Sequence, residues 1–243
     1  GPQTDISIPT HSLDDWTISE HGGHDPGRGS VVIDVGALKL SEGNSFDLTA
    51  KRTVTIPSNP GRLTFRYRDL DFASATDSEI NDAFEVALVG SNGKSLIPTY
   101  AARRDSFFNI TAGQGVAKGN TTTLDEVNQR VSVDISALPA GTQGTLIFRL
   151  VNNDQSTTTS VSLLGDVQAI GVTTQLANDT APVDSTDPAY LSDGITTDST
   201  LTGSLVGDVA QLQVQQNGGA FTDITASIVA GQFQYQPANL TAG

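Results

Sequence analysis

The amino-acid sequence predicts an all-β protein built from two β-sandwich domains, the second smaller than the first. Short apolar or alternating runs bounded by turn residues recur along the whole chain, and no sustained helical period interrupts them. The 243 residues are enough for two domains, and the texture of the sequence changes near Gly171.

The first sandwich is predicted over residues 13–171, after an N-terminal segment (residues 1–12) in which Gly1–Pro2 has the form of a scar left by tag cleavage. Leu63, Phe65 and Tyr67 alternate with polar residues, as a half-exposed antiparallel strand requires. The predicted strands are Gly29–Val35, Ala37–Leu40, Phe46–Leu48, Arg52–Ile56, Gly61–Asp69, Ala83–Val89, Val131–Asp134, Gly144–Val151 and Val161–Ile170.

Turn signals separate these strands. Asn92–Gly93 predicts a hairpin after Phe84–Val89, because both residues tolerate the positive φ of a tight turn. Pro57–Pro60 and Pro139–Gly141 predict further turns. Single helical turns are expected over residues 75–80 and 124–128.

The second sandwich is predicted over residues 172–243. Residues 173–192 are poor in large apolar side chains and are expected to form a linker and the first edge of the module. The predicted strands are Leu201–Leu205, Ala210–Gln216, Asp223–Ile228 and Gln232–Gln236.

Composition limits the possible partners. The net charge of −14 and the pI near 4.3 argue against nucleic acid, which needs a basic surface, and favour cations. The sequence contains no apolar run long enough for a membrane span and no Cys. It also lacks a nucleophile motif with a nearby base, so an enzyme is not expected.

Several short motifs follow one another across residues 13–170: Leu13-Asp14-Asp15-Trp16, Leu38–Phe46, Val54–Pro60, Ile80–Val89 and Gly165-Asp166-Val167. Their order resembles that of the carbohydrate-binding and lectin-type jelly-roll modules of large secreted bacterial proteins. The resemblance implies an extracellular or cell-surface location and a structural calcium ion that joins the opening segment to the closing strand. Its ligands here would be Asp166, with Asp15 and Glu42 as candidate partners.

Three later motifs, Leu176–Thr180, Ser192–Asp198 and Phe221–Ile224, resemble the immunoglobulin-like repeats of bacterial adhesins. Such a repeat usually continues with another hairpin, whereas this chain stops at Gly243. We therefore expect an incomplete sandwich whose open edge pairs with a neighbouring repeat or with another copy of the chain.

Acidic and amide residues at strand ends are a second reason to predict a calcium site, because calcium prefers carboxylate, amide and carbonyl oxygens. The predicted ligands in the first domain are Asp69, Asp71, Asn81, Asp82, Asn152 and Asp154; those at the junction include Asn178, Asp179, Asp193, Asp198 and Asp208. The alternative is that Asp and Asn occupy these positions because they favour turns. His21, His24 and Asp25 offer a weaker zinc or nickel site, because a glycine-rich loop lacks a rigid face.

A ligand site is predicted at Tyr100, Arg103, Arg104 and Asp105, where an aromatic ring precedes a polar loop. The alternative is local charge pairing of the two arginines with Asp105. Trp16 is expected in the core. The sequence thus predicts a calcium-stabilised module for adhesion or glycan binding on a bacterial surface protein. The alternative is a structural spacer or a self-assembling block of a fibre or surface layer.

Overall fold

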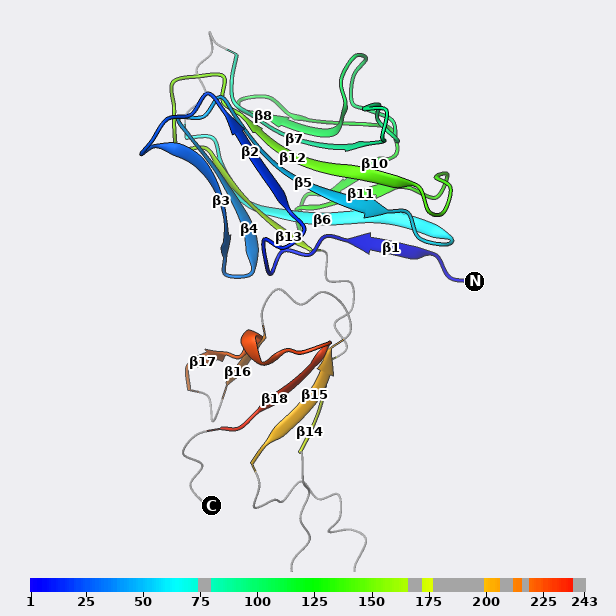
Figure 1. Cartoon of the computed structure of the whole chain (residues 1–243), viewed down its shortest axis with the longest axis vertical. Coiled ribbons are helices and arrows are strands. Elements are labelled where there is room, and N and C mark those ends of the chain that lie inside the picture. Colours follow the sequence, from blue (N-terminus) through cyan, green and yellow to red (C-terminus); the bar gives the residue numbers. More distant parts are fainter. Residues whose placement is uncertain (74–79, 166–171, 177–198, 206–211, 216–218, 238–243) are drawn as a thin grey trace, which may run out of the picture. The chain divides into compact units, whose positions relative to one another are not determined.

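The computed structural model describes residues 1–73, 80–165, 172–176, 199–205, 212–215 and 219–237 (Figure 1). These residues form β-strands and, as their only helical element, the short 3₁₀ turn η2 (Thr225–Ser227), which confirms the all-β prediction. The chain divides into two compact units, Gly1–Asp166 and Val167–Gly243. Within the described ranges, no helix has the length and apolar character needed to cross a membrane.

Two antiparallel sheets build the first unit. One has the order β10 (Thr122–Asp125), β11 (Arg130–Asp134), β6 (Pro60–Asp71), β13 (Ser160–Gly165), β4 (Ala37–Gly43) and β3 (Arg28–Asp34), and β1 (Thr4–Ser7) joins β6 in parallel. The other has the order β2 (Thr17–His21), β5 (Asp47–Thr55), β12 (Gln143–Val151), β7 (Ala83–Val89), β8 (Ser106–Thr111) and β9 (Val116–Lys118). We call them the seven-stranded and the six-stranded sheet.

The two sheets pack face to face over an aromatic core. Phe65 of β6 meets Phe148 of β12 edge to face, with 5.0 Å between the ring centroids, and it meets Phe108 of β8 in the same way. Trp16 is buried, as predicted, and its indole N–H donates to the carbonyl of Pro9 at 3.0 Å. Tyr67 is buried in the same core.

The strands differ from the prediction where tertiary contacts override the local pattern. β5 is one continuous strand rather than two, and β1, β2, β8, β9 and β10 were not among the predicted strands. The helical turn predicted over residues 124–128 is wrong: β10 extends to Asp125, whose carboxylate then accepts the N–H groups of Val127 and Asn128 and forms a tight turn. Most of the other predicted helical turn, residues 75–79, lies outside the described residues.

The predicted hairpin at Asn92–Gly93 is confirmed. Gly93 has a φ of 74°, and the N–H of Gly90 donates to the carbonyl of Lys94 at 2.8 Å, which closes the turn after β7.

The second unit contains two small antiparallel sheets (Figure 1). β14 (Val172–Leu176), β15 (Leu201–Leu205) and β18 (Gln232–Tyr235) form one, and β16 (Gln213–Gln215) pairs with β17 (Phe221–Asp223) in the other. Among the described residues, Leu205, Ile224 and Phe233 form its buried apolar cluster. The strand predicted over Asp223–Ile228 is instead the last residue of β17 followed by η2.

Candidate functional site

A polar layer closes one end of the core of the first unit. Successive residues of a strand point to opposite faces, so every second residue of a core strand faces the core. At one end of four strands this core-facing row continues into a polar residue. Glu42 follows Leu40 on β4, and Asn152 follows Leu150 of β12. Asp82 precedes Phe84 of β7, and Thr159 precedes Val161 of β13. We use the term polar layer for these four residues. Two of its strands belong to each sheet.

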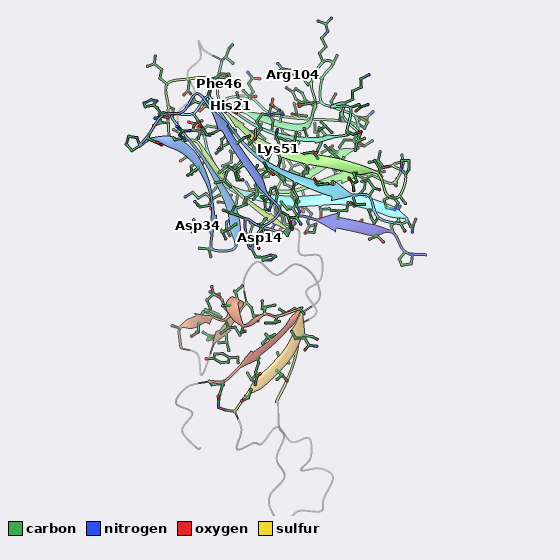
Figure 2. All side chains as sticks on the ribbon, in the orientation of Figure 1. Asp14, His21, Asp34, Phe46, Lys51 and Arg104 are labelled. Atoms are coloured by element: carbon green, nitrogen blue, oxygen red, sulfur yellow. The ribbon has the colours of Figure 1, made fainter. Side chains whose placement is uncertain are left out.

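The layer lies near Phe46, because the N–H of Asn152 donates to the Phe46 carbonyl at 2.8 Å. Figure 2 shows Phe46 beside His21 at one end of the first unit, with Asp14 and Asp34 at the opposite end.

Thr159 connects carboxylates from the two sheets. Its backbone N–H donates to Oε1 of Glu42 at 3.1 Å, and its hydroxyl donates to Oδ2 of Asp82 at 2.7 Å. The N–H of Asn153 donates to the second oxygen of Asp82 at 2.8 Å. Glu42, Asp82 and Thr159 are each at most 1% exposed, so these carboxyl groups are held inside the protein.

Two oxygen atoms of the layer have no hydrogen-bond donor. They are Oε2 of Glu42 and Oδ1 of Asn152, which are two of the six buried side-chain N and O atoms without a partner in the described part of the chain. An ionised carboxylate and an amide oxygen can only accept, so the layer has an excess of acceptors. Burying such atoms unpaired is costly.

The electrostatics of Glu42 reflect this arrangement. Burial is the largest cause that raises the pKa of its carboxyl, from 4.5 to about 7. The carboxylates of Asp82 and Asp154 raise that pKa further, while the hydrogen bonds from Thr159 lower it. Negative charge at this position is therefore disfavoured unless something positive neutralises it.

The remaining predicted metal ligands lie elsewhere. Asp15, Asp69 and Asp71 are exposed; Asp69 lies 3.7 Å from Arg68, and Asp71 accepts the N–H of Ala73. Asp154 is half-buried and accepts the N–H of Ser156. Asp166, Asp179, Asp193, Asn178, Asp198 and Asp208 lie outside the described residues.

No group of three or more His, Asp or Glu side chains in the described residues is arranged to hold a metal ion. His21 hydrogen-bonds to Asp47 at 2.7 Å, and that bond raises the pKa of its imidazole. His24 bonds to Asn44, so the two histidines have separate partners.

A second candidate site lies on the outer face of the six-stranded sheet. Arg149 of β12, Glu85 of β7 and Asn109 of β8 are directly opposite one another in the sheet register. Arg149 donates to Glu85 at 2.9 Å and to Asp105 at 3.0 Å, and the amide of Asn109 donates to Glu85 at 3.0 Å. Because Glu85 and Arg149 are only 12% and 20% exposed, this network is a rigid floor rather than a solvated surface pair.

A groove of about 300 Å³ lies over this floor. Its lining is mostly polar: Asn81, Glu85, Tyr100, Arg104, Asn109, Thr111 and Asn153, with Ile80, Ala83 and Val151 as the apolar members. Of the predicted ligand residues, Tyr100 and Arg104 line the groove, whereas Arg103 does not. Asp105 pairs with Arg149 rather than with the adjacent arginines, and this hydrogen bond is the main cause that lowers the Asp105 pKa.

The residues that sequence reasoning missed are Thr159, Glu85, Asn109 and Arg149. Arg149 had a detectable signal, since it is the one charged residue among the apolar neighbours Phe148 and Leu150 of a predicted strand. Thr159 had none, because it is one of three consecutive threonines.

Neither models of known protein families nor curated protein sequences match this chain. Its function is therefore inferred from the two sites themselves.

Proposed function

We propose that the first unit is a jelly roll. Numbered along the chain from first to eighth, β4, β5, β6, β7, β8, β11, β12 and β13 make four nested antiparallel pairs: first with eighth, second with seventh, third with sixth and fourth with fifth. The eighth also pairs with the third, and the seventh with the fourth. A long hairpin folded over into two sheets has this order, which supports the jelly-roll assignment.

The function that the sites support best is a binding module for adhesion or glycan recognition on the outside of a bacterial cell. The observation that carries this proposal is the polar groove on the six-stranded sheet. Sugars are recognised by fixed hydrogen-bonding groups beside an aromatic ring, and the groove combines the ring of Tyr100 with amide, carboxylate and guanidinium groups.

The floor of the groove is preorganised. Glu85 accepts hydrogen bonds from both Arg149 and Asn109, and Asn109 in turn accepts the hydroxyl of Thr111 at 2.9 Å. Groups held in this way lose little conformational entropy when a ligand binds. Arg104, by contrast, is exposed and stands free to reach a carboxylate or a hydroxyl group.

A glycan array probed with the labelled chain tests this function, followed by calorimetry with any sugar that binds. Arg104→Gln and Tyr100→Ala are expected to weaken that binding by about tenfold or more, since each removes a contact group of the groove. Arg103→Gln is the matched control, because Arg103 neighbours Arg104 without lining the groove. Equal losses with Arg103→Gln and Arg104→Gln, or no glycan binding at all, would contradict the proposal.

A structural role as a spacer or self-assembling block remains the second candidate, and the second unit favours it. In the described part of this unit three apolar side chains form the buried cluster, while Phe221 and Val229 are 63% and 74% exposed. We propose that this unit is an immunoglobulin-like repeat whose open edge or exposed apolar residues pack against a neighbouring repeat or a second copy. Sedimentation velocity over a range of concentrations tests self-association, and Phe221→Ser should abolish any oligomer that forms through this surface.

A further inference from the structure

We propose that the polar layer of the first unit binds one divalent cation, with calcium as the ion that its chemistry suits best. Its ligands are Oε2 of Glu42, the carboxylate of Asp82 and the side-chain oxygen of Asn152. This inference is independent of the groove and of glycan binding.

The chemical nature of the unpaired atoms carries the inference. Each atom without a partner in the layer is an oxygen that accepts, and none is a donor in need of an acceptor. A neutral network would combine donors with acceptors, whereas a cation site gathers acceptors alone. Calcium takes carboxylate, amide and carbonyl oxygens together, and these are the oxygen types present.

Burial separates this layer from an ordinary acidic turn. Asp69 and Asp71 sit in solvent, where water can satisfy their oxygens. Glu42 is 1% exposed, and the oxygen that Thr159 leaves free has no partner in the described part of the chain. Thr159 donates to both carboxylates. A positive charge beside them would remove the cost of holding both ionised.

The described residues contain no triad of acidic or imidazole groups, and the proposed site does not need one. Two of its ligands are carboxylates and the third is the amide oxygen of Asn152, which such a triad does not include. Asp154 adds negative charge near Glu42 while its Oδ1 accepts the N–H of Ser156.

A cation here would join the two sheets. Glu42 is the next-to-last residue of β4 in the seven-stranded sheet, while Asp82 and Asn152 flank β7 and β12 in the six-stranded sheet. An ion that binds only the folded state stabilises it by mass action.

The test is a calcium titration of the chelator-treated chain, followed by calorimetry and thermal unfolding. We expect one ion per chain in the first unit, and a midpoint that rises by about 5 to 10 °C when free calcium is about 100 times its Kd. Glu42→Gln, which keeps the shape and removes the charge, should weaken calcium binding by about tenfold or more. Asp69→Asn is the matched control and should leave the affinity unchanged, because Asp69 is exposed and Asn tolerates its φ of 53°.

Two results would overturn the proposal. In the first, calcium does not change the midpoint of thermal unfolding of the unaltered chain, and Glu42→Gln is as stable as that chain or more stable. Glu42 would then be a buried neutral carboxylic acid. The other is calcium binding with the same affinity in Glu42→Gln, which would place the ion elsewhere.

Backbone NMR of the unaltered chain decides the matter if Glu42→Gln fails to fold. Calcium should shift the amide signals of Thr159 and Asn153 most, because both N–H groups donate to the proposed ligands. Calcium-induced shifts confined to other residues, such as 69–71, would refute the site.

Discussion

At the scale of single residues, two groups of charged side chains in the first unit differ in how their oxygens are satisfied. Glu42 and Asp82 meet between the sheets with an excess of acceptors, whereas Glu85 and Asp105 meet on the outer face with a guanidinium between them. The same residue type is therefore satisfied in one place and unsatisfied in the other. That contrast distinguishes a complete ion pair on the outer face from the buried carboxylate for which we propose a cation.

Replacing Arg149 by Met should destabilise the first unit by about 2 kcal/mol at neutral pH, since it leaves Glu85 and Asp105 without their charged donor. The loss should shrink on acidification. Arg149 holds the pKa of Asp105 below its usual 3.8, so this stabilisation is present above pH 3.8 and disappears as the pH falls through the lowered pKa.

Urea unfolding of both proteins at neutral pH and below pH 3.8 measures this difference. Arg62→Met, at an exposed position of β6, is the control and should change the free energy of unfolding little at either pH. A loss for Arg149→Met that does not depend on pH would mean that packing of its side chain, rather than the ion pair, stabilises the sheet.

Thr159 gives a second prediction at this scale. Thr159→Val keeps the shape but removes the hydroxyl that donates to Asp82, so the free energy of unfolding should fall by about 1 to 3 kcal/mol. Thr158→Val, the exposed neighbouring position, should cost much less. Equal effects in chemical denaturation would show that the hydroxyl of Thr159 has no special role.

At the scale of strands and turns, the end of β4 is set by a glycine that no other residue can replace cheaply. Gly43 follows Glu42 with a φ of 54°, and a Cβ there would overlap the carbonyl oxygen of Gly27 and approach the nitrogen of Gly29 to 2.8 Å. Gly43 pairs with Arg28 of β3, so the backbones of β3 and β4 approach closely at this point.

Gly43→Ala should therefore destabilise the first unit by about 2 to 4 kcal/mol, from the strained φ and the steric overlap together. Gly93→Ala measures the cost of the strained φ alone. Gly93 also has a positive φ, 74°, but a Cβ there would meet nothing within 4 Å. We expect Gly93→Ala, the control, to lower the free energy of unfolding by about 1 kcal/mol. Similar losses for both variants in thermal unfolding would argue against close packing at Gly43.

The sequence predicts strands better than it predicts what the strands bring together. The alternating pattern predicts most of β6, β7, β11 and β12. It does not predict β8, because a bulge opposite Val86 and Ala87 breaks the alternation of this strand and buries both Phe107 and Phe108. Asn81 and Asp82 could be grouped with Asn152 and Asp154 because all four lie at strand ends. Glu42 entered only through a family resemblance, and its link to Thr159 spans 117 residues, which no local pattern encodes.

Failures at the sites have the same origin. Asp69 and Asp71 look like Asn81 and Asp82 in sequence, yet a register shift between β13 and the end of β6, together with the positive φ of Asp69, accompanies their exposure to solvent. Asp105 adjoins two arginines in sequence and pairs with Arg149, 44 residues away, because β12 and β8 flank β7. Register, which is a property of the whole sheet, decides which charges meet.

At the scale of the whole molecule, the two units have separate apolar cores of very different size. The first unit buries many aromatic and aliphatic side chains between its sheets, whereas the described part of the second buries Leu205, Ile224 and Phe233. Hydrophobic stabilisation scales with the apolar area removed from water, so we expect the units to unfold in two transitions, with the second unit melting first.

Differential scanning calorimetry of the chain tests this order. The lower transition should carry the smaller enthalpy, because enthalpy scales with the number of residues that unfold cooperatively. Phe233→Ala should lower that transition alone and Phe148→Ala the upper one alone, since each ring belongs to one core. A single transition that both substitutions shift equally would mean that the two cores unfold as one cooperative unit.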